Sequence, residues 1–208
     1  MKSHSAEFNT LHGKSILWFS GLLILIGFSR HLPLDYPNLL NFSPVIAIFL
    51  VGGAYFRGKF SLIIPLFAVV VSDFTLAKNY GSNLIEPFMA VTLISYILVF
   101  FIGRKLNRTH SLVKIFSSGI LSAIAFHLIT CSFSWLANPA YTKSPAGWIQ
   151  AMIMGEPGYT PAYLFLRNSV LSTTLFSVLL VFVAKRFQRL QNSPCYSSTT
   201  SDDFVKID

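Results

Sequence analysis

Six apolar stretches, separated by charged or turn-forming residues, run along the chain. They cover residues 15–29, 39–56, 60–76, 85–103, 112–137 and 163–184. A helix needs about 20 residues to cross a hydrocarbon core of ~30 Å; four stretches approach or exceed that length, and the first two are short. None alternates apolar and polar residues, as the strands of a membrane β-barrel do. The pattern predicts an all-α protein, a polytopic membrane helical bundle with six transmembrane helices.

One membrane domain accounts for most of the chain. We expect it to span residues 15–185, between a cytoplasmic N-terminal tail at 1–14 and a disordered, Ser/Thr/Asp-rich cytoplasmic tail at 186–208. Hydrophobic residues make up 53% of the 208 positions and charged residues 12%. A soluble domain carries about 25% charged residues, so the composition favours a protein whose outer surface contacts the lipid bilayer.

The net charge of +8 is distributed in a way that predicts topology rather than nucleic-acid binding. With six spans, 12 of the 16 Lys and Arg residues fall on the side of the two termini, 3 fall on the other side, and Arg167 lies inside the last helix. The twelve are Lys2, Lys14, Arg57, Lys59, Arg104, Lys105, Arg108, Lys114, Lys185, Arg186, Arg189 and Lys206. Because loops rich in Lys and Arg stay in the cytoplasm, we expect an inner-membrane protein with both termini cytoplasmic and no nucleic-acid partner.

Local signals refine two of the predicted segments. At the second stretch, Ser43 suits a helix N-cap and Pro44 suits the first helical turn. The small residues at 52–54, near its far end, permit close contact with another helix. The longest connection, residues 138–162, contains an apolar patch at 148–154. We expect this patch to lie in the membrane interface as a half-helix or a lid.

Two charged residues, Asp73 and Arg167, stand within apolar stretches, where a charge is costly and indicates function by default. Asp73 follows Phe60 by 13 residues, or ~20 Å of helix, and Arg167 precedes Lys185 by 18 residues, or ~27 Å. Both therefore reach the outer third of the predicted bundle, where other helices deliver polar or aromatic residues. The candidate substrate-binding residues are Arg30, Asn41, Asp73, Trp135, Arg167 and Asn168.

Two interpretations of the charges in this outer layer stay open. In the first, Arg167 and Arg30 meet a carboxylate or phosphate, and Asp73 orients Arg167 or accepts a ligand N–H. In the second, Asp73 pairs with Arg167 or Arg30 only to lock helices together. The acids of the layer balance its bases, so the sequence leaves the sign of the ligand's charge open. These acids are Asp35, Asp73, Glu86 and Glu156.

His127 lies in the middle of the fifth stretch, and we expect it to bond a neighbouring helix, because no partners for a metal site or proton relay are evident. Trp135, Tyr141 and Trp148 fit either an interfacial aromatic belt or the wall of a pocket for a ring-shaped ligand. The usual enzyme signatures are absent from the sequence. We therefore expect no catalytic residue, no metal site and no cofactor.

Several motifs carry a family resemblance. The segments Asn-Phe-Ser-Pro-Val-Ile-Ala at 41–47 and Gly-Gly-Ala-Tyr-Phe at 52–56 are followed by Pro65, by Ser-Asp at 72–73 and by Leu-Arg-Asn-Ser at 166–169. They resemble an uncharacterised family of bacterial integral-membrane proteins, which is itself similar to the S components of energy-coupling-factor vitamin transporters. The resemblance implies a six-helix subunit that captures a vitamin or similar micronutrient near the outer face. It also implies a transmembrane scaffold and two ATPases as partners.

Three functions follow from these observations. The first is a substrate-binding subunit for uptake of a small solute, energised by partner subunits. The second is a structural or scaffolding membrane protein without a ligand, whose basic loop at 104–114 contacts lipid or a partner. The third, an enzyme acting on a lipid, needs a nucleophile or base next to Asp73 or His127, and the sequence offers none at readable spacing.

Overall fold

The computed structural model shows a helical chain. It describes residues 21, 24–56, 58, 60–80, 86–106 and 111–192, and within these ranges no residue forms a strand. Residues 24–35 are helical, and they precede η1 (Pro37–Leu39), α2 (Val45–Tyr55), α3 (Phe60–Tyr80), α4 (Pro87–Leu106), α5 (Leu112–Ala137), α6 (Pro145–Ile153) and α7 (Ala162–Asn192). The predicted tail at 1–14 and the chain from 193 onward lie outside the described residues. Because α7 continues to Asn192, the start of the predicted disordered tail, residues 186–192, is helical.

Within the described part of the chain, four helices are long and apolar enough to cross a membrane. Their candidate spans are Phe60–Asn79, Pro87–Leu106, Leu112–Ala137 and Ala162–Arg186. These spans confirm the helices predicted from the apolar stretches at 60–76, 85–103, 112–137 and 163–184. Together they indicate a membrane protein, built from helices throughout its described part.

The second predicted stretch is shorter in the structure than in the sequence pattern. α2 begins at Val45 rather than near residue 39, because residues 37–39 form η1 and Asn41 adopts a left-handed backbone with φ of 60°. This start agrees with the one predicted from Ser43 and Pro44. Its 11 residues give a helix of ~16 Å, about half the thickness of a hydrocarbon core. The first predicted stretch, at 15–29, falls largely outside the described residues. The count of six spans therefore stays a prediction.

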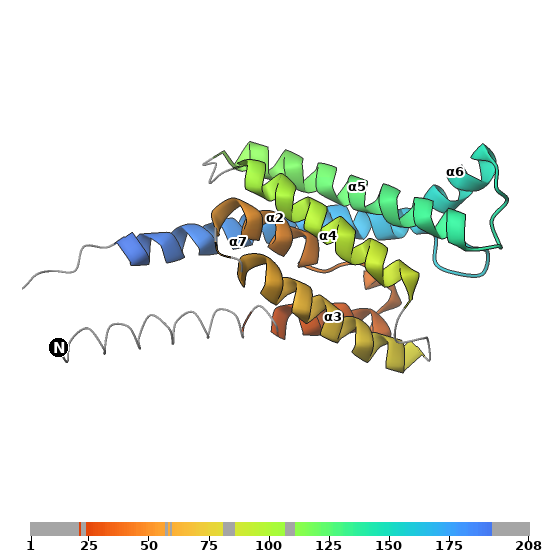
Figure 1. The fold of residues 1–208 in the computed structure, drawn as a ribbon, viewed down its shortest axis with the longest axis horizontal. Helices are drawn as coiled ribbons and strands as arrows, with labels where there is room; N and C mark the ends of the chain where they lie inside the picture. Colours follow the sequence, from red (N-terminus) through yellow and green to blue (C-terminus); the bar gives the residue numbers. More distant parts are fainter. Residues whose placement is uncertain are drawn as a thin grey trace, which may run out of the picture.

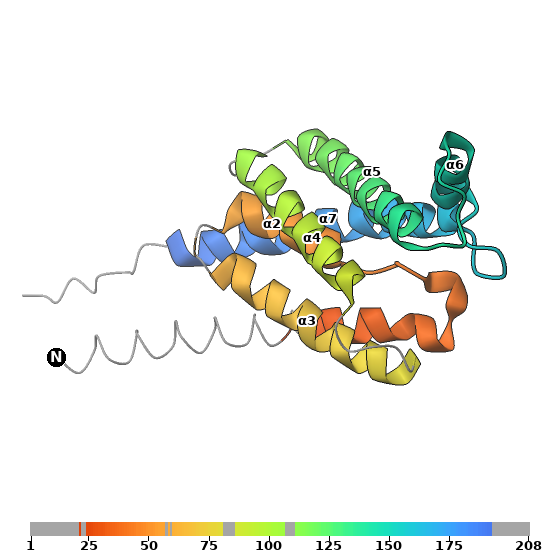
Figure 2. The same cartoon turned by 45° about the vertical axis from the view of Figure 1, so that its right-hand side comes forward.

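α2 occupies the centre of the bundle. It packs most extensively against α4 and then against α7, and nearly all of its side chains are buried. Figures 1 and 2 show α3 and the helical residues 24–35 running side by side along one flank of this core. α2 is apolar all round, and in this bundle other helices rather than lipid cover nearly all of it.

Two glycines allow the backbones of α2 and α4 to touch. A Cβ atom added to Gly53 would lie 2.2 Å from the Phe100 carbonyl oxygen, and one added to Gly103 would lie 2.1 Å from the Leu50 carbonyl oxygen. No side chain fits at either position without moving a helix. The prediction that small residues at 52–54 permit close helix contact is thus confirmed at Gly53.

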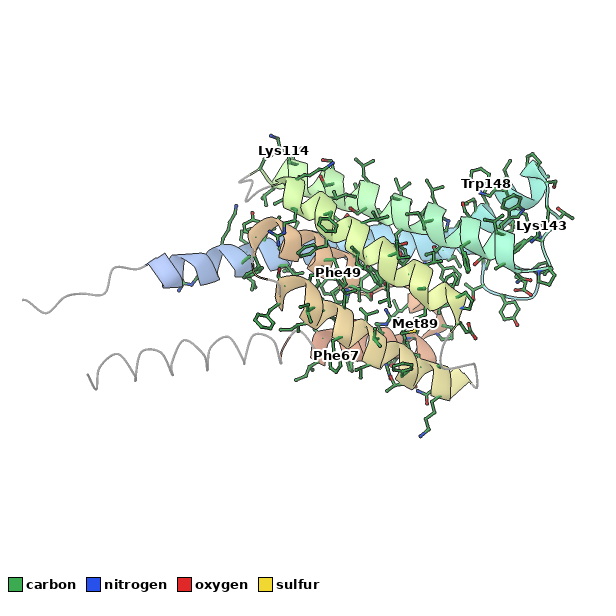
Figure 3. The ribbon with its side chains drawn as sticks, viewed as in Figure 1. Phe49, Phe67, Met89, Lys114, Lys143 and Trp148 are labelled. Atoms are coloured by element: carbon green, nitrogen blue, oxygen red, sulfur yellow. The ribbon has the colours of Figure 1, made fainter. Side chains whose placement is uncertain are left out.

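The polarity of α7 is reversed relative to a helix on the surface of a soluble protein. Its buried face carries Asn168, Ser169, Ser172, Thr173 and Ser177. Its exposed face carries Leu171, Leu175, Leu179 and Phe182. Small polar residues at helix contacts and large apolar residues outside are typical of helices surrounded by lipid. Figure 3 shows the same contrast elsewhere, with Phe49 in the interior and Phe67 on the outer surface of α3.

The two ends of the bundle differ in charge. One end, here called the basic end, holds the C-terminal ends of α2, α4 and α7. Its described basic residues are Arg104, Lys105, Lys114, Lys185 and Arg186. The opposite end, here called the loop end, holds residues 36–44, residues 138–161 and α6; Figure 3 places Lys114 at the basic end and Lys143 at the loop end. The remaining residues of the predicted basic side fall at positions whose side chains lie outside the described part, and the orientation in a membrane stays a prediction.

Candidate functional site

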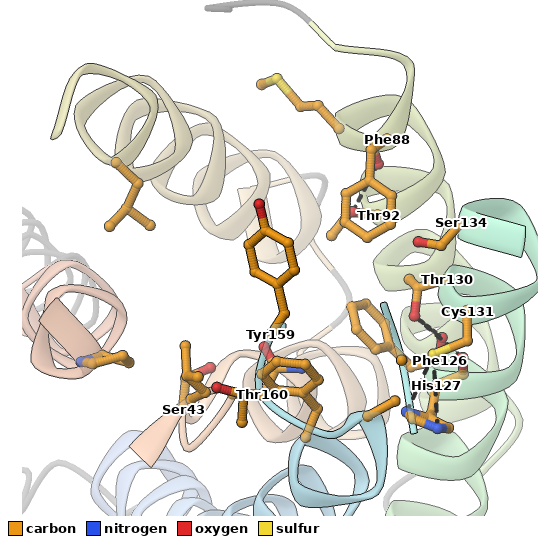
Figure 4. Close-up of a pocket in the computed structure, with 18 of the residues that line it drawn as sticks. Ser43, Phe88, Thr92, Phe126, His127, Thr130, Cys131, Ser134, Tyr159 and Thr160 are labelled. Carbon is orange, nitrogen blue, oxygen red and sulfur yellow. Dashed lines mark hydrogen bonds between the residues drawn. The ribbon is translucent and has the colours of Figure 1, made fainter. Parts of the chain in front are cut away.

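A cavity of about 570 Å³ opens at the loop end of the bundle. Its walls come from the helical residues 24–35, the turn before α2, helices α3, α4 and α5, and the α6–α7 connection. Figure 4 shows polar and aromatic side chains facing it together, among them Thr92, Phe126, Thr130 and Tyr159. Small-molecule sites commonly occupy roughly 300–1,000 Å³ with this mixture of apolar walls and a few polar groups.

α6 and its flanking loops lie across one side of the cavity. Ser144 caps the helix by accepting from the Gly147 N–H over 3.2 Å, and Pro145 follows at the first turn, where its missing N–H is not needed. Trp148 Nε1 donates to Ser132 Oγ of α5 over 3.0 Å, which holds α6 against that helix. The predicted patch at 148–154 is therefore largely helical, over Pro145–Ile153. Its exposed face includes Ile149 and Ile153.

His127 connects the middle of α5 to the end of α6. Its Nε2 lies 2.9 Å from the Met152 carbonyl oxygen. Because a carbonyl only accepts, Nε2 carries the proton, and in the neutral ring Nδ1 presents a lone pair. The expectation that His127 bonds a neighbouring helix is confirmed. The same ring also lines the cavity, which the sequence did not predict.

Arg30 and Asp73 form an ion pair in the cavity wall. Arg30 Nη2 donates to Asp73 Oδ1, which joins the helical residues 24–35 to α3. The side chains are 15% and 19% exposed, so most of the pair is withdrawn from solvent. Of the two pairings predicted for Asp73, the structure has the one with Arg30. The Nε of Arg30 has no partner among the described residues.

Arg167 lies outside the cavity, and its predicted contact with Asp73 is wrong. Its Nε and Nη2 donate to Asn168 Oδ1 over 3.2 and 3.1 Å. Asn168 is buried, and its Nδ2 donates to the carbonyl oxygens of Asn38 and Leu40, each over 2.8 Å. Asn168 therefore ties α7 to the turn between η1 and α2, and neither residue is among those that line the cavity.

The remaining two candidate residues divide in the same way. Asn41 lines the cavity from the turn before α2, where the left-handed backbone suits an asparagine. Trp135 does not line it: its Nε1 donates to the Thr142 carbonyl oxygen over 2.9 Å, beside a separate surface pocket shared with Lys143 and Trp148. The cavity thus brings together Arg30, Asn41 and Asp73, and it excludes Trp135, Arg167 and Asn168.

Several lining residues were missed as site residues from the sequence. Glu86 precedes α4, while Tyr141 and Glu156 come from the long loop. The depth of such residues in the bundle cannot be estimated by counting along a helix. Asn138 Nδ2 donates to Glu156 Oε2 over 2.7 Å and fixes that carboxylate at the end of α5. Burial, and then the charges of Glu156 and Cys131, raise the pKa of Tyr141, so its phenol stays neutral. Tyr96 lies within an apolar stretch, so the sequence indicates a buried packing residue rather than a site residue.

The geometry favours binding over acid–base chemistry. Cys131 Sγ lies 3.7 Å from both ring nitrogens of His127, so it does not lie along the Nδ1 lone pair, as a proton donor would. Among the described residues, no group of three or more His, Cys, Asp and Glu side chains is placed to hold a metal ion. A ligand-sized cavity with fixed polar groups is what these residues provide.

The fold and the cavity define a class: a helical membrane protein with a ligand-sized cavity at one end of its bundle. The family model of DUF6580, a family of unknown function, matches residues 11–193, and the chain belongs to this family. No curated protein and no solved structure matches the chain. The family match agrees with the resemblance to an uncharacterised family and carries no link to S components.

Proposed function

We propose that this protein is a membrane substrate-binding subunit for uptake of a small solute of the vitamin or micronutrient class. In this proposal six helices cross the inner membrane, both termini are cytoplasmic, and the loop end faces outward. A transmembrane scaffold and ATPase subunits supply the energy, because the sequence carries no ATP site of its own.

The cavity at the loop end is the observation that supports this proposal. Its volume of about 570 Å³ suits a compound of vitamin size. It lies at the end opposite the basic residues, which is the outer end if the positive-inside rule applies. α6 and the α6–α7 connection border it, in the position of a cover that opens to admit a solute.

The alternative is a scaffolding membrane protein without a ligand. The Arg30–Asp73 pair favours it, because an ion pair between two helices stabilises their packing whether or not a ligand binds. The position of Arg167 outside the cavity also removes one of the cations expected to hold an anionic solute. In this alternative the cavity holds only water or lipid.

Mass spectrometry of small molecules extracted from the purified full-length protein separates the two. Ser134 lines the cavity on α5, so Ser134→Trp fills it, whereas Leu128→Trp adds similar bulk on the outward, exposed face of the same helix. The proposal predicts a stoichiometric compound in the wild type and in Leu128→Trp and its loss in Ser134→Trp. Extracts free of any such compound in all three would favour the scaffold.

A further inference from the structure

The cavity holds more negative than positive side chains. Among the described residues that line it, the carboxylates are Asp73, Glu86 and Glu156, and the guanidinium is that of Arg30. Arg30 is already paired with Asp73, so its charge is compensated within the wall. The two glutamates have no Lys or Arg partner of their own among the described side chains that line the cavity. The structure thus gives the cavity an excess of negative charge that the sequence, which balanced all outer acids and bases, did not predict.

Three neutral polar groups of the wall have their protons engaged and offer acceptors to a ligand. Thr92 Oγ1 donates to the Phe88 carbonyl oxygen over 2.8 Å, and Thr130 Oγ1 donates to that of Phe126 over 2.9 Å. Each hydroxyl has one proton, so only lone pairs remain for a ligand. His127 likewise uses its Nε2 proton on Met152 and keeps the Nδ1 lone pair. Donors also remain in the wall: Arg30 Nε is buried without a partner among the described residues, and the Asn41 amide, the Ser134 hydroxyl and the Tyr159 phenol line the cavity as well.

Aromatic rings form the apolar part of the wall. Tyr96 and Phe126 stack with their centroids 4.9 Å apart, and Phe88, Tyr141 and Phe165 also line the cavity. A flat ring packs against such walls, and their faces attract positive charge through the ring quadrupole.

We propose that this cavity selects a small, ring-bearing organic cation whose N–H or N-alkyl positive end lies toward Glu86 and Glu156. The inference rests on the proposed function, because it names the substrate class of the same cavity. A carboxylate or phosphate ligand would instead lie beside two glutamates that have no Lys or Arg partner in the wall.

The test uses three probes with one ring and three charges: the cation 1-methylnicotinamide, neutral nicotinamide and the anion nicotinate. Dissociation constants are measured by calorimetry on the full-length protein in lipid nanodiscs. The cation is expected to bind at least about tenfold more tightly than nicotinamide, and nicotinate more weakly than either, since fixed charges in a partly enclosed site act on the ligand charge alone.

Matched variants locate the effect. Glu86→Gln and Glu156→Gln are each expected to weaken binding of the cation about three- to tenfold and to leave nicotinamide unchanged. Glutamine at 156 keeps the oxygen that accepts from Asn138, so the fold is preserved. Asp35→Asn makes the same chemical change at an exposed residue of the loop end outside the cavity, and it should alter neither affinity.

The outcomes separate this inference from the function on which it rests. Tighter binding of nicotinamide or nicotinate than of the cation, abolished by Ser134→Trp, would overturn the cation assignment and leave a ligand-binding cavity. If no probe binds, the compound retained by the purified protein decides: a cation supports the inference and an anion overturns it. If no probe binds and the extracts contain no bound compound, both the cation assignment and the proposed function are overturned.

Discussion

Asp73 and Arg30 are charged residues that lie within helices and are largely withdrawn from solvent. Each is costly inside a membrane when alone, and the ion pair between them lowers that cost. The pair lies in the wall of the cavity, so it serves helix packing and shapes the site at once. Its exposure, below one fifth for both side chains, makes the loss of one partner more damaging than for a surface salt bridge.

Asp73→Asn should destabilise the protein, because it leaves the Arg30 guanidinium without its counter-charge. We expect a loss of roughly 3 kcal/mol, or a fall in Tm of roughly 6–12 °C for a chain of this size. Thermal unfolding of the protein in detergent measures it, with the exposed Asp35→Asn as control. The double variant Arg30→Gln/Asp73→Asn should lose less than the sum of the two single changes; additive losses would contradict a direct pairing.

Removal of the Asn168 side chain should destabilise the protein, whereas removal of the neighbouring Arg167 side chain should leave ligand binding unchanged. Asn168→Ala leaves the carbonyl oxygens of Asn38 and Leu40 without their donor, and we expect it to cost about 1–3 kcal/mol. Arg167→Ala removes an exposed side chain that does not line the cavity, so the retained compound should stay bound. Thermal unfolding and extraction of bound compounds check the two variants. Loss of the compound in Arg167→Ala with the fold intact would return Arg167 to the site.

At the scale of the helices, the apolar pattern predicted the long membrane helices, because the length and composition of a stretch are enough to identify them. The stretches that became α3, α4, α5 and α7 exceed or approach a membrane span, and each is a helix close to its predicted bounds. For α2 the apolar stretch alone began too early, near residue 39, whereas the local signals at Ser43 and Pro44 predicted a start next to the observed Val45. The turn before it, with its left-handed Asn41, is held by contacts with α7 that are 128 and 130 residues away in sequence. A local pattern contains no information on such contacts.

Gly103→Ala should break the contact between α2 and α4. Its Cβ would lie 2.1 Å from the Leu50 carbonyl oxygen, so the helices must separate and leave voids in the core. We expect a loss of about 2–3 kcal/mol, seen as a fall in Tm of roughly 4–12 °C. Gly27→Ala is the control, since nothing lies within 4 Å of its added Cβ and alanine favours a helix. Equal stability of both variants would contradict the close packing.

The sequence predicted only some of the residues that line the cavity. Depth along a helix identified Asp73, and Arg30 and Asn41 were assigned to the same level. The same counting did not place Arg167 correctly. Counting residues gives the height of a residue along the bundle, but it does not say which face of the helix carries its side chain. Glu86, Tyr141 and Glu156 reach the cavity from helix ends and loops, whose course is set by contacts such as Asn138 with Glu156.

The whole molecule is organised by the contrast between its ends. Basic residues gather at one end, and the cavity with its acidic residues opens at the other. The apolar outer faces of the long helices between them match a lipid environment. If the basic end is cytoplasmic, the cavity receives solutes from outside.

Cysteine labelling in intact cells tests this orientation. In a background without native cysteines, Lys143→Cys at the loop end should react with a membrane-impermeant maleimide. Lys114→Cys at the basic end should react only after the membrane is broken, because loops rich in Lys and Arg remain inside. Both side chains are exposed, so access to the reagent differs only through the membrane. The reverse pattern would place the cavity on the cytoplasmic side.

The central claim is that the loop-end cavity is a ligand site. A high-resolution cryo-electron microscopy map of the full-length protein, purified in nanodiscs without added ligand and bound to a rigid antibody fragment, tests it most directly. We expect non-protein density of the size of a small molecule between Asp73, His127 and Glu156, absent in Ser134→Trp. A cavity closed by its own side chains in the wild type, with no such density, would contradict it.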